Sequence, residues 1–361
     1  MQEDNRERLI RYNDRTSVPF TIPPVLVLST GRCGSTMISE LLNRHPAVLS
    51  LSEFAVLLGQ EAFARRHPTG AEMWRLLSRQ SPALNAMMRV GEVMDEVLYP
   101  LGAPGSRFRV EDVPPIAMVT LPHLTDRHEA LFDELSGVVP AWPRRDLATQ
   151  YRTLFDYLGR KYGRRVWVER SGGSLMLARK LLRLFPDARV IHVFRDGRDT
   201  AISMSGHPNF RLLVAAIGMY RRFGRDPYRD MMREENRMRD VWLERAVFPF
   251  IDAPKLAARA TLPQLGEFWS QLILLGLRVF ADLSPDRVLP LRFEDVQERP
   301  REMLDRMIRF IDPSLADEAW LEAAAAVPRP ARSRYTSLPP AELRALTDAC
   351  APGLAALGYL A

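Results

Sequence analysis

The chain has 361 residues, of which 47% are hydrophobic and 26% charged, and its formal net charge is +6 at pH 7. This composition is typical of a globular protein and excludes extensive disorder and fibrous or low-complexity chains, while only two cysteines, Cys33 and Cys350, exclude a disulfide framework. Only three of the 50 basic residues are lysines, and the arginines are scattered along the chain. They fit an enzyme with a polyanionic small-molecule substrate as well as a nucleic-acid-binding protein. The chain has no basic tail and no basic run interleaved with aromatic residues, which are features of nucleic-acid binding.

The N-terminal residues 1–22 are predicted to be an irregular polar lead-in, because they contain no apolar segment of the kind found in secretory signals. The longest apolar run, near 272–283, is interrupted by Gly276 and Arg278 and is shorter than the roughly 20 residues that span a bilayer. We therefore expect a reduced, cytoplasmic protein without a membrane span.

Short apolar runs bounded by turn signals predict five buried strands, at 25–28, 48–51, 166–168, 189–194 and 288–293. Helical patterns lie between them, at 36–44, 175–184, from about Asp199, which is a good N-cap type, at 301–310, and in the tail after a loop that starts at Pro328. Strands that alternate with helices predict an α/β fold, with a parallel sheet of about five strands flanked by helices.

Two long segments interrupt this alternation and are mostly helical in pattern. Residues 54–160 carry no recognisable catalytic motif, and residues 207–285 are helical and charged. We interpret the chain as a single domain over residues 1–361, with both segments as helical insertions at one end of the sheet.

The loop between the first strand and the first helix has the composition of an anion site. It runs Ser29-Thr30-Gly31-Arg32-Cys33-Gly34-Ser35-Thr36, and a glycine-bearing loop that enters a helix directs backbone N–H groups and the helix dipole at a negative group. Compared with the nucleotide-triphosphate P-loop, Ser29 replaces the first glycine and Ser35 replaces the lysine, while Arg32 supplies the fixed positive charge. The alternative interpretation is an ordinary glycine-rich turn.

A second candidate site follows the fourth strand, in Arg195-Asp196-Gly197-Arg198-Asp199. Arg195 stands at the carboxyl end of a predicted parallel strand, where open α/β sheets bind ligands, and Ser203 lies within the following helix. Taken alone, this segment is better explained as a solvated charged loop with an internal salt bridge. Two anion sites at one sheet edge together indicate a ligand with two separated phosphate groups.

Three segments that contain these motifs resemble the sulfotransferases that use 3′-phosphoadenosine 5′-phosphosulfate (PAPS). Residues 29–54 resemble their 5′-phosphosulfate loop, and residues 183–204 resemble their 3′-phosphate segment, in which an arginine is followed by a serine eight residues later. Residues 289–311 resemble a later strand–helix segment, with Phe293 in place of the usual tyrosine. The three segments cover about a quarter of the chain, and the bacterial and tyrosylprotein branches are the most similar.

The resemblance implies cofactor and catalytic roles for individual residues. Arg32, Cys33, Gly34, Ser35 and Thr36 fall on the loop that holds the 5′-phosphate and sulfuryl group, and Arg195 and Ser203 fall on the 3′-phosphate ligands. Cys33 is interpreted as a small apolar residue rather than a catalytic thiol.

Glu53 lies 21 residues after Arg32, where the tyrosylprotein branch has its catalytic glutamate, which makes it our candidate general base. Arg170 falls where that branch has a catalytic lysine; because arginine does not readily release a proton, we expect it to act only as an electrostatic stabiliser, beside Arg32. The segment 170–174 also lacks the proline common in the family. The alternative for Glu53 is an exposed loop carboxylate or a member of an ion pair, and His123 is the second candidate base.

The sequence therefore predicts a sulfotransferase that moves the sulfuryl group of PAPS to a hydroxyl, or less readily an amine, of a small molecule, glycan or lipid, and that releases adenosine 3′,5′-bisphosphate. The insertions 54–160 and 207–285 are expected to line the acceptor site. No cluster of metal-ligating residues is evident, so metal-independent catalysis is expected. The alternatives are a P-loop kinase and a nucleotide-binding protein without catalysis. The identity of the acceptor and the oligomeric state are left open.

Overall fold

The computed structural model describes residues 20, 22–81, 84, 85, 88, 97–233, 252–330 and 332–360. Most of the predicted polar lead-in, together with parts of both predicted insertions, lies outside the described residues.

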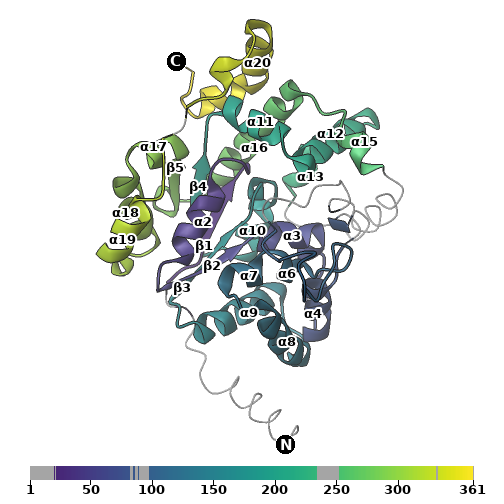
Figure 1. The fold of residues 1–361 in the computed structure, drawn as a ribbon, viewed down its shortest axis with the longest axis vertical. Coiled ribbons are helices and arrows are strands. Elements are labelled where there is room, and N and C mark those ends of the chain that lie inside the picture. Colours follow the sequence, from purple (N-terminus) through teal and green to yellow (C-terminus); the bar gives the residue numbers. More distant parts are fainter. Residues whose placement is uncertain are drawn as a thin grey trace, which may run out of the picture.

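Five parallel strands form one sheet in the order β2-β3-β1-β4-β5 (Figure 1). Their bounds are β1 Val25–Ser29, β2 Val48–Ser52, β3 Val166–Arg170, β4 Arg189–Phe194 and β5 Val288–Arg292. All five predicted strands are confirmed within two residues, and β5 ends one residue early because Phe293 opens a helix. The parallel α/β fold predicted from the sequence is therefore correct.

Continuous apolar runs form these strands because helices cover both faces of the sheet. Every residue of β1, β2 and β3 is buried, as the run pattern of a doubly covered parallel sheet requires. Alternate residues of β1 belong to different cores: Leu26 and Leu28 pack in one, and Val25 and Val27 pack in the other.

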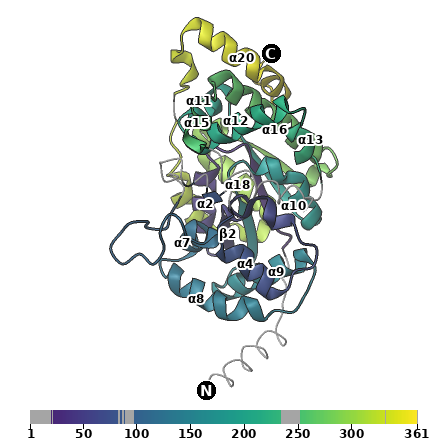
Figure 2. The ribbon, with the colours of Figure 1, turned by 90° about the vertical axis from the view of Figure 1, so that its right-hand side faces the viewer.

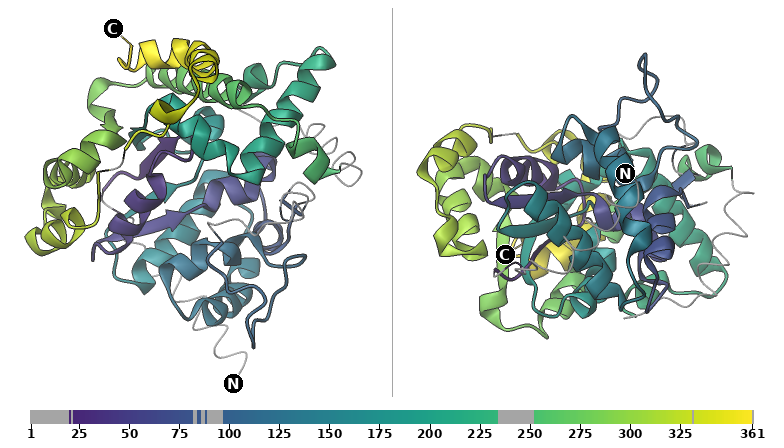
Figure 3. Two further views of the ribbon diagram at one scale, coloured as in Figure 1. Left: turned by 45° about the horizontal axis from the view of Figure 1, so that its top comes forward. Right: turned by 90° about the horizontal axis from the view of Figure 1, so that it is seen from below.

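One face of the sheet is covered by helices that follow β1 and β5. The smaller core joins this face to α2 (Ser35–Asn43), α18 (Pro300–Ile311) and α19 (Glu318–Ala325). The short helix α17 (Phe293–Glu298) connects β5 to α18. Figures 1 and 3 show α18 and α19 at the β5 side of the sheet, away from the first insertion.

The other face packs against α10 (Ala178–Leu184), α11 (Gly197–Ser205) and α16 (Leu262–Phe280) through the larger core. The predicted helix 175–184 begins as a 3-10 turn, η3 (Ser174–Leu177), before α10. The expected helix start at Asp199 is wrong, because α11 starts at Gly197 and Asp196 is its N-cap, whose side chain accepts a hydrogen bond from the Arg198 N–H. Asp199 is instead a buried residue of the first turn.

The first insertion packs against β2 and β3, and within the second, α12 packs against both α11 and α16. The helices of the first insertion are α3 Phe54–Leu58, η1 Gly59–Phe63, α4 Gly70–Ser78, α6 Pro115–Met118, α7 Thr120–Leu124, α8 His128–Val138, η2 Val139–Ala141 and α9 Leu147–Lys161. Those of the second are α12 Pro208–Arg222, α13 Pro227–Met231 and α15 Ala253–Ala257, followed by α16, which also lies within residues 207–285 and packs in the larger core. Figure 2 shows α11, α12, α13, α15 and α16 in the upper part of the molecule and α4, α8 and α9 in the lower part, with β2 between the two groups.

The chain ends in α20 (Pro340–Ala356), which packs across α16 and α11. Short 3-10 turns occupy Pro285–Arg287 (η5), Pro313–Leu315 (η6) and Tyr335–Ser337 (η7). The close contact between α16 and α20 depends on Gly353, where a Cβ would lie 2.7 Å from the ring of Trp269. In the part of the chain that the structure describes, no helix has both the length and the apolar character required to cross a bilayer.

Candidate active site

Four of the predicted site residues stand at the carboxyl ends of four different strands. Arg32 follows β1, Glu53 follows β2, Arg170 ends β3 and Arg195 follows β4. Because all strands are parallel, these ends meet at one edge of the sheet, which is where open α/β sheets bind ligands. The fold therefore gathers side chains from four separate segments.

The loop between β1 and α2 requires glycine at two positions. Gly31 and Gly34 have φ angles of +77° and +83°, in the left-handed region that favours glycine. A Cβ at Gly34 would lie 1.9 Å from the ring of Phe293, and one at Gly31 would lie 2.5 Å from the ring of Phe210. Since Gly34 is the N-cap of α2, this tight loop places the positive end of the α2 dipole at the sheet edge.

Backbone strain also marks the site. Within the described backbone, Arg32 and Glu53 are the only non-glycine residues with positive φ, and both have a φ of 55°. A residue held in this region costs about 1–3 kcal/mol and persists only where its surroundings impose it, which is common at active sites. The two strained positions are the proposed phosphate-binding arginine and the proposed base.

The two predicted anion segments are in direct contact. Arg32 Nε donates a hydrogen bond of 3.2 Å to the Oγ of Ser203, which lies in α11. The segment predicted for the 5′-phosphosulfate and the segment predicted for the 3′-phosphate therefore border the same space.

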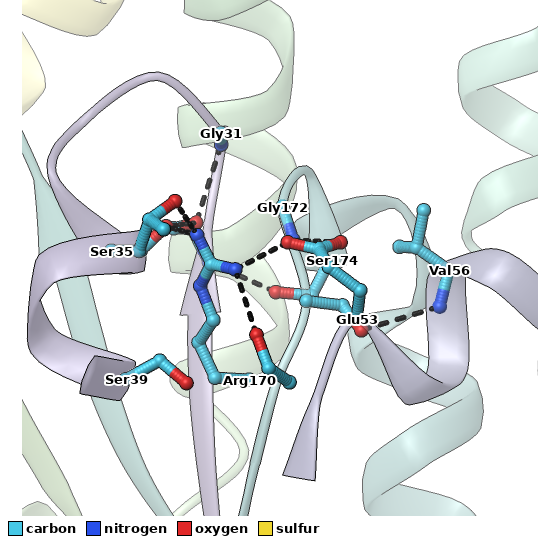
Figure 4. A network of polar contacts seen from close by, with 12 residues as sticks. Gly31, Ser35, Ser39, Glu53, Val56, Arg170, Gly172 and Ser174 are labelled. Carbon is cyan, nitrogen blue, oxygen red and sulfur yellow. Dashed lines mark hydrogen bonds and ion pairs between the residues drawn. The ribbon is translucent and has the colours of Figure 1, made fainter. Parts of the chain in front are cut away.

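A buried arginine joins the proposed base to the anion loop (Figure 4). Arg170 Nη1 forms a short ion pair with Glu53 Oε1, and Nη2 donates to the hydroxyls of Ser35, at 3.2 Å, and of Thr36. The Arg170 side chain is 3% exposed and that of Glu53 is 10% exposed. One guanidinium thus holds the carboxylate on one side and the first turn of α2 on the other.

Glu53 is anchored by its backbone as well as by its side chain. Its N–H donates to the Arg170 carbonyl at 2.7 Å, and both carboxylate oxygens accept from the Gly172 N–H, at 3.1 and 3.0 Å. Because Oε2 makes no second hydrogen bond among the described residues, it can accept one more proton donor. Of the two alternatives for Glu53, the exposed loop carboxylate is wrong, since the residue is buried, whereas the ion pair is present, with Arg170 as its partner.

Residues 171–174, which follow β3 and depart from the family pattern, help to fix the position of the candidate base Glu53. The Ser171 hydroxyl donates to Glu169 Oε1 at 2.5 Å and accepts from the Val56 N–H at 3.2 Å, and the same Glu169 oxygen accepts from the Ala55 N–H at 3.1 Å. These bonds tie the start of α3, and with it Glu53, to β3. Burial raises the pKa of Glu169 to about 7.

Ser174 ends the same segment and fixes the start of the anion loop. Its hydroxyl accepts from the Ser29 N–H and donates to the Val27 carbonyl, each at 3.2 Å. Ser29 Oγ in turn accepts from the Gly31 N–H at 3.2 Å. The serine that replaces the first P-loop glycine therefore braces the loop from within.

In the second candidate anion segment, the carboxylate of Asp199 orients the side chain of Arg195. Its Oδ2 accepts from Arg195 Nη2 at 3.3 Å, and its Oδ1 accepts from the backbone N–H groups of Arg334 and Tyr335, at 2.7 and 3.3 Å. Arg198 forms a salt bridge with Asp196 and lies over the ring of Tyr335, 3.9 Å from its centroid. The C-terminal segment thus holds the second anion segment in place.

All of these groups border one cavity of about 680 Å³. Its wall contains every predicted site residue except Cys33, that is Arg32, Gly34, Ser35, Thr36, Glu53, Arg170, Arg195 and Ser203. The remaining wall comes mainly from the two insertions. A volume of this size is typical of pockets that bind small molecules.

Cys33 does not face the cavity. Its side chain is fully buried, its thiol lies 3.5 Å from the Val193 carbonyl, and it belongs to the core beneath α2. Burial raises its pKa, which opposes formation of a reactive thiolate. The placement fits a small apolar residue of the loop, and the Cys33 side chain has no contact with the candidate ligand space.

His123 also lines the cavity but is a poor base. Burial, reinforced by the charge of Arg170, lowers the pKa of His123 to about 4. Its Nε2 lies within hydrogen-bonding distance of the hydroxyls of Ser39, at 3.4 Å, and Ser50, at 3.2 Å. These contacts fit a packing role better than proton transfer. His192, inside β4, is buried with a similarly low pKa of about 4.

Sequence reasoning missed Glu169, Ser171, Gly172 and Ser174 as parts of the site. The signal available was a glycine pair directly after a buried strand, which allows a backbone N–H to approach another group closely. Among the residues that the structure describes, no group of three or more metal-ligating side chains is found.

A sequence profile of the sulfotransferase family matches residues 23–317, which include all four strand ends and both insertions. Comparison with curated proteins found no match.

Solved structures similar to this chain include a sulfotransferase domain of the Synechococcus PCC 7002 olefin synthase (16% identity, 92% of this chain and 86% of that chain, TM-score 0.43). A sulfotransferase domain from the curacin biosynthetic pathway has 15% identity over 94% and 98% of the two chains, with a TM-score of 0.45. The sulfotransferase STF9 from Mycobacterium avium has 14% identity over 98% and 79%, with a TM-score of 0.42. On the profile match over most of its length, this chain belongs to the sulfotransferase family.

Proposed function

We propose that the protein transfers the sulfuryl group of PAPS to a hydroxyl group of an acceptor. The observation that carries the proposal is the convergence of Arg32, Arg170 and Arg195 on one cavity beside a buried carboxylate, Glu53. Arginine is the side chain best suited to bind phosphate and sulfate through paired N–H groups.

The residues fit a ligand with two separated anionic groups. The start of α2, with Arg32, Ser35 and Thr36, would hold the 5′-phosphosulfate, since hydroxyls, a cation and the helix dipole meet there. Arg195 and Ser203 would hold the 3′-phosphate. The lysine that clamps the β- and γ-phosphates in triphosphate P-loops is replaced by Ser35, which disfavours ATP.

PAPS supplies the sulfuryl group, and adenosine 3′,5′-bisphosphate is the leaving product. Glu53 would accept the proton of the acceptor hydroxyl while the hydroxyl oxygen forms a bond to sulfur and the bond between sulfur and the oxygen of the 5′-phosphate breaks. Arg170 would orient Glu53 and, with Arg32, stabilise the negative charge that develops on the departing phosphate.

The donor assignment predicts selective thermal stabilisation. Adenosine 3′,5′-bisphosphate should raise the melting temperature without magnesium, because it binds only the folded state; at 100 times Kd this contributes about 2.7 kcal/mol. ATP with magnesium should raise it little, and adenosine 5′-monophosphate, which lacks the 3′-phosphate, should lie between. Differential scanning fluorimetry measures all three. If ATP raised the melting temperature more than the bisphosphate did, and only with magnesium, the protein would be a kinase and the sulfotransferase proposal would fail.

Arg195→Ala is expected to weaken binding of adenosine 3′,5′-bisphosphate by about 1.5–3 kcal/mol, because charge-assisted hydrogen bonds to the 3′-phosphate are lost. Binding of adenosine 5′-monophosphate should change much less. Titration calorimetry measures both affinities. Arg309→Ala is the matched control, since Arg309 is exposed on α18, pairs with Asp305 and does not line the cavity. Unchanged affinity for the bisphosphate in Arg195→Ala would remove Arg195 from the site.

A further inference from the structure

Away from the strand ends, most of the cavity wall is apolar, although it also contains polar residues such as Gln60, Ser81 and Asn209. Leu57, Leu84, Leu98 and Val119 contribute to it from the first insertion, and Leu213 and Met231 contribute from the second. These side chains come from separate helices and loops that share no sequence motif. A wall of this kind binds a ligand chiefly by removing apolar surface from water.

The charges around the cavity are distributed unevenly. Among the described residues, the only lysine or arginine side chains in its wall are Arg32, Arg170 and Arg195, and the proposed donor site uses all three. The other charged residues in the wall are carboxylates, including Glu40 and Glu61.

This distribution is informative because the chain as a whole is basic, with a net charge of +6. An enzyme for acidic peptides or anionic polysaccharides would be expected to place cations along its acceptor site, since opposite charges guide and hold such substrates. Here the described wall beyond the donor site offers no such cation and carries the exposed carboxylate of Glu40, which would repel an anion.

If the protein is the sulfotransferase proposed above, on which this inference rests, we propose that its acceptor is a neutral, predominantly apolar small alcohol or phenol. Its hydroxyl would point at Glu53, and its hydrocarbon body would lie against the leucines of both insertions. An acidic tyrosine peptide and an anionic glycan are thereby disfavoured as acceptors.

A homologous series of primary alcohols tests this inference. With labelled PAPS, kcat/KM should rise by about fourfold for each added methylene from butanol to decanol, until the cavity is filled. Each hydroxy acid of the same chain length should be at least about tenfold poorer than its alcohol, because its carboxylate loses hydration without gaining a cation. Decanol should also raise the melting temperature of the complex with adenosine 3′,5′-bisphosphate, which gives a readout independent of turnover.

The apolar wall is tested with Leu213→Ser. This variant should reduce the increase of kcat/KM with alcohol chain length and leave binding of the bisphosphate unchanged. Leu182→Ser is the matched control, because Leu182 is also half-buried but lies on α10, outside the cavity wall. The control should retain the full dependence on chain length.

The outcomes separate the acceptor inference from the proposed function. Normal binding of the bisphosphate together with preferred sulfation of hydroxy acids or an acidic tyrosine peptide would overturn the apolar acceptor and leave the sulfotransferase proposal standing. The same holds if no alcohol of the series binds or is sulfated. Failure of the bisphosphate to bind would instead overturn the proposed function.

Discussion

Glu53→Gln is expected to lower sulfuryl transfer by about 100-fold or more, while binding of adenosine 3′,5′-bisphosphate stays close to that of the unchanged protein. The substitution keeps the shape of the side chain and its hydrogen bond from the Gly172 N–H, but removes the carboxylate that would take the acceptor proton. A fall in kcat without a change in product affinity would identify a group needed in the transition state.

Two further variants control this experiment. Glu40→Gln also removes a carboxylate from the cavity wall, but Glu40 is exposed on α2, so the turnover of this variant should change little. His123→Ala should retain most activity, because His123 has a pKa of about 4 and contacts Ser39 and Ser50. Wild-type turnover in Glu53→Gln combined with loss in His123→Ala would transfer the role of base to the histidine.

Arg170→Met is expected to have the largest combined effect on stability and activity. The substitution leaves the carboxylate of Glu53 buried without its cation, which typically costs about 3–5 kcal/mol of folding free energy. It also removes a donor to the Ser35 and Thr36 hydroxyls, and loss of one such stabilising group commonly lowers turnover by about 10²–10³-fold. Urea denaturation and turnover measure the two effects separately.

A double variant separates folding from chemistry at this pair. Glu53→Gln combined with Arg170→Met removes both charges, so stability should recover toward that of the unchanged protein while activity stays lost. Arg170→Lys keeps the charge but cannot donate to both partners in the same plane, so its turnover should lie between Arg170→Met and the wild type. Wild-type activity of Arg170→Met would show that Arg170 is only a packing residue.

The sequence predicted the strands and the first helix well because their signals are local. Buried parallel strands are mostly apolar, and each of the five is bounded by prolines, glycines or charged residues. The start of α11 was less predictable, since Asp196 and Asp199 are both good N-cap residues and only tertiary contacts distinguish them. Asp199 is held inside the helix by the N–H groups of Arg334 and Tyr335, which lie far along the chain.

The sequence by itself determined the order of strands and helices, the two anion segments, and the candidate side chains Arg32, Glu53, Arg170 and Arg195. The elements and the two candidate anion segments depend on residues close together in the chain, where backbone conformation and side-chain type are coupled, whereas Glu53 and Arg170 became candidates through the resemblance to the sulfotransferase family. The sequence could not show that Glu53 is buried, because that depends on β2 lying beside β3.

Only the tertiary structure decided how these parts act on one another. Strand pairing places Ser52 opposite Arg170, and this register brings the guanidinium between the carboxylate of Glu53 and the hydroxyls at the start of α2. The apolar cavity wall likewise arises from leucines of two insertions that carry no motif. Such features were hidden in the sequence because contacts between distant segments depend on how the elements pack, and no local pattern encodes that packing.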